Sequence, residues 1–373
     1  MTQQLRESGM VAEIFDLAVI GGGPAGTSAA ITAARNGARV LLMEGGTIPR
    51  HKVCGEFISA ESLRLLDDLL CKLPHAQTFL QTAPSISRLR LLFGERALEV
   101  RISPAALSLS RHRLDAILWN AALQAGVEAR TQCEVTSVEG EGPFLLKTAQ
   151  CHFEAKSLII AAGKWSRFTM DRAVPSGPKW IGLKAHQRED EPPSETDLYF
   201  FEHGYCGVQP VADDVVNVCA MVRSDQATSL NAIFALHPGL ARRAAGWSAM
   251  MSPITTGPLI YRAPQPVRQN ALLVGDAAGF IDPFVGDGIS IALHSGVVAA
   301  RCLSMFLSRC GSLSSAVAAY NERYWRLFAP LISAAAGVRA LLCLPSLARI
   351  LAFEALRLPG VMPLMICKTR VKG

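Results

Sequence analysis

A glycine-rich turn between two hydrophobic strands is the feature that most constrains how this chain can fold. Phe15 to Ile20 predicts a buried strand, and the letters GGGPAG lead from it into a predicted helix over Pro24 to Asn36. Gly37 is placed to end that helix, and Ala38 to Met43 predicts a second buried strand. Strand, tight turn, helix and parallel strand form a βαβ unit, the building block of a doubly wound α/β sheet.

The turn has the spacing GxGxxG, which is typical of dinucleotide binding when an acid ends the second strand. The first glycine permits the tight turn, the second lets the backbone approach a diphosphate, and the third lets helix and strand pack closely. Amides at the start of the helix attract phosphates, and the acid accepts hydrogen bonds from an unphosphorylated ribose, as in FAD or NAD. The cofactor-binding residues predicted here are Gly21, Gly23, Pro24, Ala25, Gly26 and Glu44.

A second motif, between Leu272 and Leu293, favours FAD over NAD. A predicted strand over Ala271 to Val274 leads to Gly275 and an acid, and a pair of glycines opens a long predicted helix. An acid directly after a strand can bind a polyol hydroxyl, and amides at a helix N-terminus can stabilise the negative charge of a reduced isoalloxazine ring. The residues predicted to contact the flavin are Asp276, Gly286, Asp287, Gly288 and Ile289.

Composition excludes several other classes of protein. Half of the 373 residues are hydrophobic and 18% are charged, which excludes a disordered chain and indicates apolar surface or an apolar substrate. The net charge of +6 is too small a bias to indicate nucleic-acid binding. The ten cysteines have neither CxxC pairs nor zinc-site spacing, so we expect no metal and no structural disulfides. The first ten residues lack the apolar segment of a signal peptide, so we expect a cytoplasmic protein.

Six segments between residues 14 and 330 resemble the geranylgeranyl reductase family of FAD-dependent oxidoreductases, within the p-hydroxybenzoate hydroxylase superfamily. They are IGGGPAG, PRHKVCGEF (49–57), SRHRLD (110–115), AAGKWSR (161–167), GYCGVQPV (204–211) and GDAAGFIDPFVGDGI. The resemblance implies that Asp276 contacts the flavin ribityl chain and that the loop from Gly286 to Ile289 lies beside the pyrimidine edge. The cofactor-binding residues that it adds are Arg50, Arg111 and Gly163.

Candidates for chemistry and for substrate contact rest on fewer signals. Cys54 matches the cysteine of the family's KxCG loop. This match implies one of two roles: a redox or substrate-positioning residue, or a small residue that packs under the isoalloxazine ring. Tyr205 lies in a stretch from Trp180 to Met221 that predicts an antiparallel sheet, and it either contacts the substrate or belongs to the core. Single histidines in apolar stretches are more often structural than catalytic, which applies to His186, His203 and His294.

The chain departs from the family at the end of a predicted strand over Ser157 to Ala162. Most relatives have Ala-Asp-Gly there, whereas residues 161–163 are Ala-Ala-Gly, so the aspartate that assists FAD and nicotinamide contacts is missing. The electron donor is then either NAD(P)H or a ferredoxin or reductase partner. Flavin-dependent halogenases share this fold, but neither lysine–tryptophan pair, at 164–165 and 179–180, continues as their WxWxIP segment.

These patterns predict an α/β fold with three parts: a doubly wound, Rossmann-like FAD-binding domain of the glutathione-reductase type, an inserted mixed-sheet substrate domain, and C-terminal helices. The FAD-binding domain is expected over 12–75, 105–170 and 265–310, the substrate domain over 76–104 and 171–264, and the C-terminal helical region over 311–373.

The C-terminal region is apolar and basic. From Leu331 onward six basic residues accompany one acid, Glu354, and the apolar runs are too often interrupted to span a bilayer. These helices either cover the substrate cavity or lie in the membrane interface with their basic residues toward anionic lipid.

The leading hypothesis is an FAD-dependent oxidoreductase that transfers hydride from reduced flavin to a C=C bond of a lipophilic isoprenoid or polyketide-like substrate. The alternative is a monooxygenase that hydroxylates through a C4a-hydroperoxyflavin, and a minor alternative is a non-catalytic, membrane-associated flavin-binding protein. The partners expected are a small lipophilic substrate, an electron-donor protein and the inner face of the membrane, reached through the C-terminal region.

Overall fold

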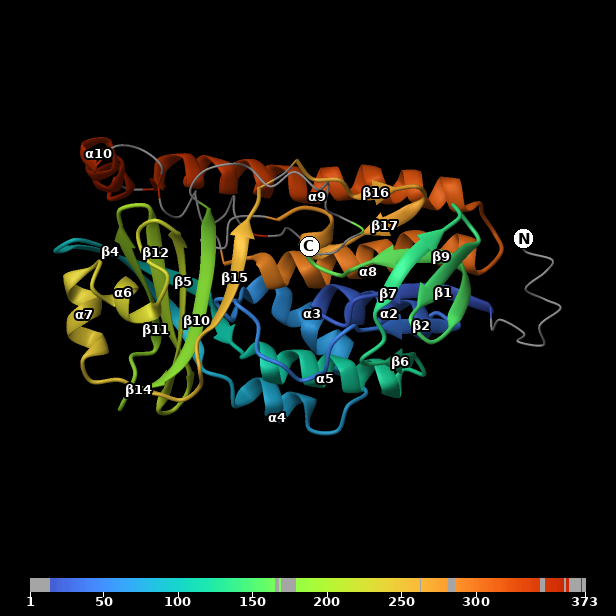
Figure 1. Cartoon of the computed structure of the whole chain (residues 1–373), viewed down its shortest axis with the longest axis horizontal. Helices are drawn as coiled ribbons and strands as arrows, with labels where there is room; N and C mark the ends of the chain where they lie inside the picture. Colours follow the sequence, from blue (N-terminus) through green and yellow to red (C-terminus); the bar gives the residue numbers. More distant parts are fainter. Residues whose placement is uncertain are drawn as a thin grey trace.

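Two β-sheets lie at opposite ends of an elongated molecule, and long helices run between them (Figure 1). The computed structural model describes residues 14–164, 168, 179–261, 263–280, 286–342, 346–358, 360–361 and 370. The α/β class with a doubly wound part, a mixed sheet and C-terminal helices is confirmed.

The first sheet is the one that the glycine-rich turn predicts. Its strands are β1 (Ile14–Ile20), β2 (Val40–Met43), β6 (Glu128–Arg130), β7 (Val135–Glu139), β8 (Phe144–Thr148), β9 (His152–Ile160), β16 (Val267–Arg268) and β17 (Ala271–Leu273). They run in the order β16-β17-β9-β1-β2-β6, and the five strands from β17 to β6 are parallel. All four residues of β2 and the second half of β1 are buried, as expected of parallel strands covered on both faces. β7 and β8 continue antiparallel from β9.

The second sheet is mixed. Its strands are β3 (Phe57–Ile58), β4 (Ser85–Phe93), β5 (Arg96–Ser108), β10 (Trp180–Arg188), β11 (Glu195–Phe201), β12 (Gly204–Ala212), β13 (Val215–Arg223), β14 (Ser248–Ala249) and β15 (Ile254–Leu259). β11 and β4 are parallel, and the remaining pairs are antiparallel. β3 pairs with the end of β5, so residues 57–58, which the sequence assigned to the FAD-binding domain, add a strand to the second sheet.

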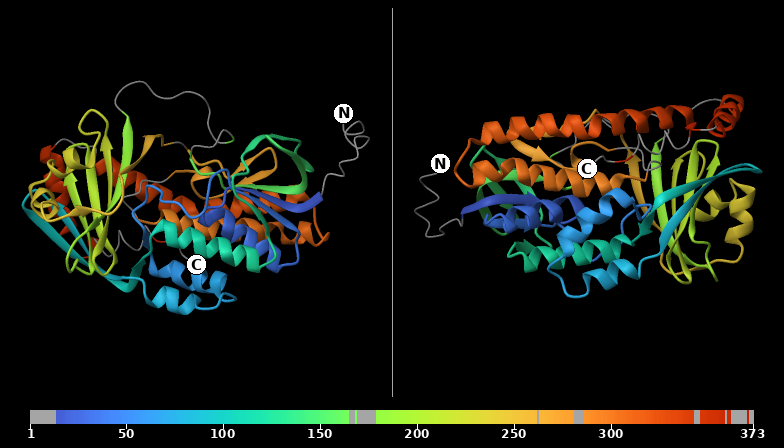
Figure 2. Two further views of the ribbon diagram at one scale, coloured as in Figure 1. Left: turned by 60° about the horizontal axis from the view of Figure 1, so that its bottom comes forward. Right: turned by 180° about the vertical axis from the view of Figure 1, so that it is seen from behind.

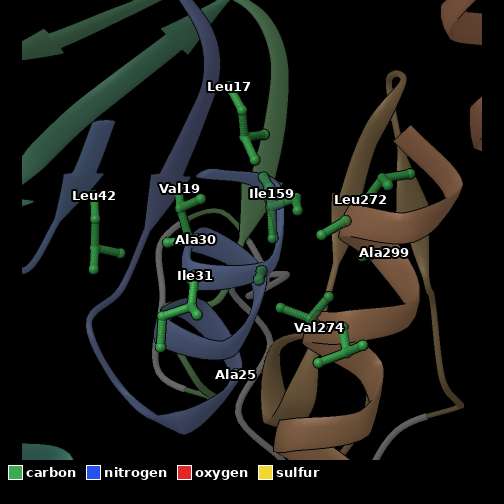
Figure 3. Packing of buried hydrophobic residues seen from close by; sticks show 14 of the residues in the cluster. Leu17, Val19, Ala25, Ala30, Ile31, Leu42, Ile159, Leu272, Val274 and Ala299 are labelled. Carbon is green, nitrogen blue, oxygen red and sulfur yellow. The ribbon is translucent and has the colours of Figure 1, made fainter. Parts of the chain in front are cut away.

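Helices cover both sheets. They are α2 (Pro24–Arg35), α3 (Ala60–Leu70), α4 (Ala76–Gln81), α5 (Arg111–Gln124), α6 (Leu230–Phe234), α7 (Pro238–Ala244), α8 (Gly288–Leu307), α9 (Leu313–Leu342) and α10 (Ser346–Leu356), with a 3₁₀ turn over Gly275–Ala277. Figure 3 shows the main core, in which apolar side chains of the first sheet pack against α2 and α8. On the second sheet, α6 and α7 cover the outer face (Figure 1).

The C-terminal helices tie the two halves together. α9 runs from the first sheet toward the second, and α10 lies at the far end over the second sheet (Figures 1 and 2). Tyr320 of α9 is fully buried and donates a hydrogen bond to the carbonyl oxygen of Leu273 at 2.6 Å. Phe353 of α10 is buried against the second sheet, where its ring stacks on Phe93. α10 therefore covers the side of the second sheet opposite to α6 and α7.

Among the described residues, α8 alone has the length and hydropathy of a membrane-spanning helix. Most of this helix is buried, since it packs between α2 and α9 in the core of the first sheet. Its apolar composition is explained by that packing.

The close contact of α2 with α8 depends on Gly296. A Cβ atom there would lie 2.2 Å from both the carbonyl oxygen of Ala25 and the Oγ of Ser28. We expect Gly296→Ala to lower the free energy of unfolding by about 1–3 kcal/mol, because the two helices must separate. Urea denaturation followed by circular dichroism measures this change.

Gly337→Ala in α9 is the matched control. Gly337 is exposed and a Cβ there meets nothing within 4 Å, so the same substitution should leave stability unchanged or raise it by about 0.5–1 kcal/mol. Equal effects of the two substitutions would contradict the close helix contact.

Candidate functional site

The glycine-rich turn has the geometry that its motif predicts. Gly21 has φ +109°, a conformation that favours glycine, and it turns the chain sharply after β1. Gly23 is the N-cap of α2 and borders a cavity together with Pro24 and Ala25. Gly26 does not line the cavity. A Cβ there would lie 1.8 Å from the carbonyl oxygen of Gly21, so the start of the helix packs directly on the turn. Its role is the close packing of helix on turn rather than direct contact.

Glu44 follows β2 and is fixed by three donors. Its Oε2 accepts the N–H of Gly22 at 2.8 Å, and its Oε1 accepts the N–H of Gly46 at 3.0 Å and Nη2 of Arg50 at 2.7 Å. Burial alone would raise the pKa of Glu44, but Lys52 and the backbone donors lower it below its ordinary value. An ionised carboxylate at the cavity wall is suited to accept hydrogen bonds from ribose hydroxyls.

Two cations face the turn at Gly23. A Cβ on Gly23 would lie 3.5 Å from Nη2 of Arg111 and 3.8 Å from Nζ of Lys52. Arg111 donates twice to Asp115 at 2.7 Å, which fixes the orientation of its guanidinium group. Burial opposes the charge of Arg111, but Asp115 and Cys54 raise its pKa. Burial and Arg111 lower the pKa of Lys52, a cation that the sequence motifs did not single out.

The second motif reaches the same cavity from β17. Gly275 has φ +58° and its Cβ position lies 3.0 Å from Cβ of Ala25, so the strand end and the start of α2 are in contact. Asp276 lines the cavity within the 3₁₀ turn. Beyond residues 281–285, which lie outside the described part of the chain, the cavity wall continues with Gly286, Gly288 and Ile289.

Asp287 departs from its predicted role. It does not line the cavity, and its buried carboxylate accepts a hydrogen bond from Nη1 of Arg370 at 2.8 Å. Burial raises the pKa of Asp287 to about 6, although Arg370 acts in the opposite direction. The guanidinium of Arg370 also lies 5.2 Å from the ring centroid of Phe57 and borders the cavity. Sequence reasoning missed this pair because its members are 83 residues apart.

One cavity of about 970 Å³ connects the two sheets. Apart from Gly26 and Asp287, every predicted cofactor-binding residue lines it, including Arg50, Arg111 and Gly163. Its wall on the side of the second sheet is largely apolar, with Leu89, Ile102, Leu198, Met221 and Leu259. The cavity therefore joins a polar part beside the glycine-rich turn to an apolar chamber.

Cys54 and Tyr205 both line this cavity. The Sγ of Cys54 accepts the N–H of Glu56 at 3.4 Å, and Cys219 of β13 lines the same wall. Tyr205 of β12 is 4% exposed and its ring centroid lies 6.1 Å from that of Phe200. Tyr205 thus belongs to the core of the second sheet and presents part of its side chain to the chamber. The role of each residue in chemistry or substrate contact stays a prediction.

The strand end at residues 161–163 lies in the cavity wall, as the family segment implies. Alanine replaces the family's aspartate there, and Lys164 follows with its Nζ 4.1 Å from the ring centroid of Phe280. Burial lowers the pKa of Lys164, and Asp276 acts in the opposite direction. This edge of the cavity therefore carries a lysine that sequence reasoning did not assign to the site.

Sequence reasoning also missed Glu56, which borders the cavity and is fully buried. It accepts hydrogen bonds from Lys184, from Nε2 of His186 at 2.8 Å and from the N–H of Arg111 at 2.7 Å. Burial would raise the pKa of Glu56, but His186 and Lys184 lower it. Lys184 and His186 are two residues apart on β10, so both point to the same face of the strand.

The hydrogen-bonding side chains and the glycine-rich turn of this cavity fit FAD. The glycine turn leaves room for a diphosphate, and Arg111 and Lys52 would neutralise it. Glu44 would hold the adenosine ribose and Asp276 the ribityl chain, since both residues line the same cavity.

Comparisons with known proteins show which proteins this chain is similar to. Residues 15–180 match the family model described as pyridine nucleotide-disulphide oxidoreductase. The chain is 28% identical over 328 residues to the digeranylgeranylglycerophospholipid reductase of Thermoplasma volcanium, which covers 78% of each protein. It is 25% identical over 342 residues to conditioned medium factor receptor 1 of Dictyostelium discoideum, and spans 64% of that protein's length.

The solved structure of the flavin-dependent brominase Bmp2 has the same fold, with a TM-score of 0.79 and 20% identity, covering 96% of this chain and 93% of that one. The family match, the fold and the two motifs that meet in one cavity agree on an FAD-dependent oxidoreductase, with distant homologues named digeranylgeranylglycerophospholipid reductase.

Proposed function

We propose that the protein reduces a C=C bond of a lipophilic substrate with an isoprenoid or polyketide-like chain, using bound FAD. The observation that carries this proposal is the continuity of the cavity, which leads from the dinucleotide turn at Gly23 to an apolar chamber walled by Leu198 and Met221. Similarity to reductases named for a lipid substrate supports the same class of substrate.

The chain's own residues divide the work of such a reaction. Bound FAD in its reduced form supplies the hydride. Arg111, Lys52 and Glu44 would hold the polar end of the cofactor in place. The chamber excludes water with the side chains of the second sheet, which favours an apolar chain over a polar one. A proton must also reach the second carbon of the double bond, and Glu56 is an ionisable group in this wall.

The C-terminal helices support a further part of the proposal, that the protein contacts the inner face of the cytoplasmic membrane. Phe353 faces the second sheet, while Leu351 and Leu358 are 65% and 60% exposed. One side of α10 thus packs on the protein, while Leu351 of this helix and Leu358 just after it present apolar side chains to the outside. A lipophilic substrate held in a membrane could enter a nearby chamber without crossing water.

Anaerobic reoxidation separates the candidate reactions. We expect that the dithionite-reduced protein, mixed without oxygen with the enal geranial or with geranylgeranyl lipids, recovers its oxidised flavin absorbance and yields a product heavier by two hydrogens. Absorbance and mass spectrometry measure both quantities.

Three other outcomes would contradict the reductase. Reoxidation only after oxygen is admitted, with a hydroxylated product, would identify a monooxygenase. A brominated product that requires bromide and oxygen would identify a halogenase. Flavin that neither dithionite nor any tested donor reduces would identify a non-catalytic flavin-binding protein. Parallel assays with NADPH, NADH and reduced ferredoxin test the electron donor.

Lys52→Met should weaken FAD binding by about tenfold, because a charge-assisted contact to the diphosphate contributes roughly 1.5 kcal/mol. Fluorescence titration of the apoprotein with FAD measures the dissociation constant. Lys72→Met, the same change at an exposed position, is the control and should leave the constant unchanged. Equal FAD affinities of the two variants would show that Lys52 makes no contact with the cofactor.

A further inference from the structure

A buried group of ionisable side chains lies behind the cavity wall, where the loop before β3 meets the second sheet. Its centre is Glu56, whose two carboxylate oxygens are bonded to Lys184 and His186. Lys184 is fully buried, and His186 is 9% exposed. Glu56 also has φ +62°, a conformation that is unfavourable for a residue with a side chain, so the surrounding bonds hold it in place.

The group continues from His186 toward the outside. The ring centroid of His51 lies 5.1 Å from that of His186 and 4.9 Å from that of His112, on which it is stacked. One ligating atom each of His51, Glu56 and His186 lie within 4.8 Å of one another, a separation that one water molecule bridges. The buried Nδ1 of His51 has no hydrogen-bond partner among the described residues. His51 and His112 are both partly exposed.

The opposite end of the group reaches the cavity. Glu56 borders it directly, and Cys54, which accepts the N–H of Glu56, lines the same wall. Asn217 of β13 donates to the carbonyl oxygens of Cys54 and Gly55 at 3.1 and 2.9 Å, so this part of the loop is fixed to the sheet. The ionisable series therefore extends from a partly exposed histidine to the chamber.

We propose that His112, His51, His186 and Glu56 form a proton relay that supplies the cavity, with Lys184 as the residue that positions Glu56. This inference rests on the proposed reductase function. Reduction of a C=C bond places hydride, with its two electrons, on one carbon and a proton on the other, and FAD returns to its oxidised state. The Glu56 carboxylate takes a proton from His186 and passes it to the substrate carbon, and His51 and His112 then restore the proton of His186 from solvent.

The charges around Glu56 suit a relay better than a metal ion. The groups that face it and its partners are Lys184 and His186 on β10, Asn217 and Cys219 on β13, His51 and Cys54 in the loop, and Arg111 and His112 on α5. A divalent cation would have to displace the ammonium of Lys184 from the carboxylate beside the guanidinium of Arg111, which like charges oppose. Burial and the nearby side chains of Lys184, His186 and His112 lower the pKa of His51, which favours transfer of a proton away from this ring.

A histidine exchange measurement tests the relay without requiring turnover. In the FAD-loaded protein labelled with ¹⁵N-histidine, we expect the side-chain N–H of His186 to exchange with water at a rate that His51→Phe lowers by about tenfold or more. His152→Gln, at an exposed position on β9, is the control and should leave the rate unchanged. An exchange rate that is the same in the wild type and in His51→Phe would overturn the relay.

Reoxidation kinetics distinguish a relay from a structural ion pair. The double variant Glu56→Gln/Lys184→Met removes both charges and so avoids leaving one buried and unpaired. A structural pair would tolerate this neutral replacement, whereas a relay would not. We expect the double variant to bind FAD and to melt at the same temperature as the wild type. Its reduced flavin should nevertheless be reoxidised by geranial about 10²-fold more slowly than that of the wild type.

Ferricyanide provides the control reaction, because this one-electron oxidant needs no proton at carbon. Ferricyanide should reoxidise the wild type and the double variant at equal rates.

The rate of reoxidation by geranial should also depend on pH. In the wild type this rate should fall as pH rises, because the relay loses its protons, and the dependence should disappear in His186→Gln. Equal geranial rates in all variants would overturn the relay.

Two further results are decisive. If geranial and the lipids fail to reoxidise the wild type, the reductase function fails, and the exchange measurement alone decides the relay. Stoichiometric zinc binding that His51→Phe abolishes would identify a metal centre and overturn the relay.

Discussion

Four hydrogen bonds between the ends of five neighbouring parallel strands hold the site together. In each case the residue after one strand donates its backbone N–H to the strand beside it, so all the strand ends stop at one edge of the sheet. These bonds run from Glu44 to Arg130 (2.8 Å), from Gly21 to Met43 (2.7 Å), from Ala161 to Ile20 (2.7 Å) and from Val274 to Ile160 (3.0 Å). Because the turns that follow leave from this edge, the glycine turn, the acid after β2 and the motif after β17 must meet in one place.

Charged side chains around the cavity are held in opposed pairs. Arg111 is held by Asp115, Arg50 by Glu44, and Lys184 by Glu56. Taking such charges out of water is costly, and a buried pair need not stabilise the fold more than apolar residues would. Their value here is orientation, since each pair fixes at least one side chain that borders the cavity, namely Arg111, Arg50 with Glu44, and Glu56. Their partners also lower the pKa of Glu44 and of Glu56, against the effect of burial.

The amino-acid sequence predicted the parts of the site that lie close together along the chain. GxGxxG, the acid at Glu44 and the strand before Asp276 are local patterns with local geometry, and the structure has them as expected. Contacts between distant segments could not be foreseen. His186 reads as a single histidine in an apolar strand, and only the fold brings Glu56, 130 residues away, to its imidazole. Asp287 was assigned to the cofactor because its neighbours are, but its partner lies near the C-terminus.

The division of the cavity between two sheets explains how one fold can serve reductases and a brominase. The first sheet supplies the turns that suit FAD, and these are the segments in which the motifs occur. The second sheet supplies most of the apolar wall, from strands between residues 85 and 108 and between 180 and 259. Substrate choice can therefore change on the second sheet without disturbing the cofactor. Glu56 lies where the two parts join, directly before β3, so the same loop that contacts Arg111 also carries the proposed source of protons. In the proposed relay, this position places the proton donor beside both the cofactor part of the cavity and the apolar chamber.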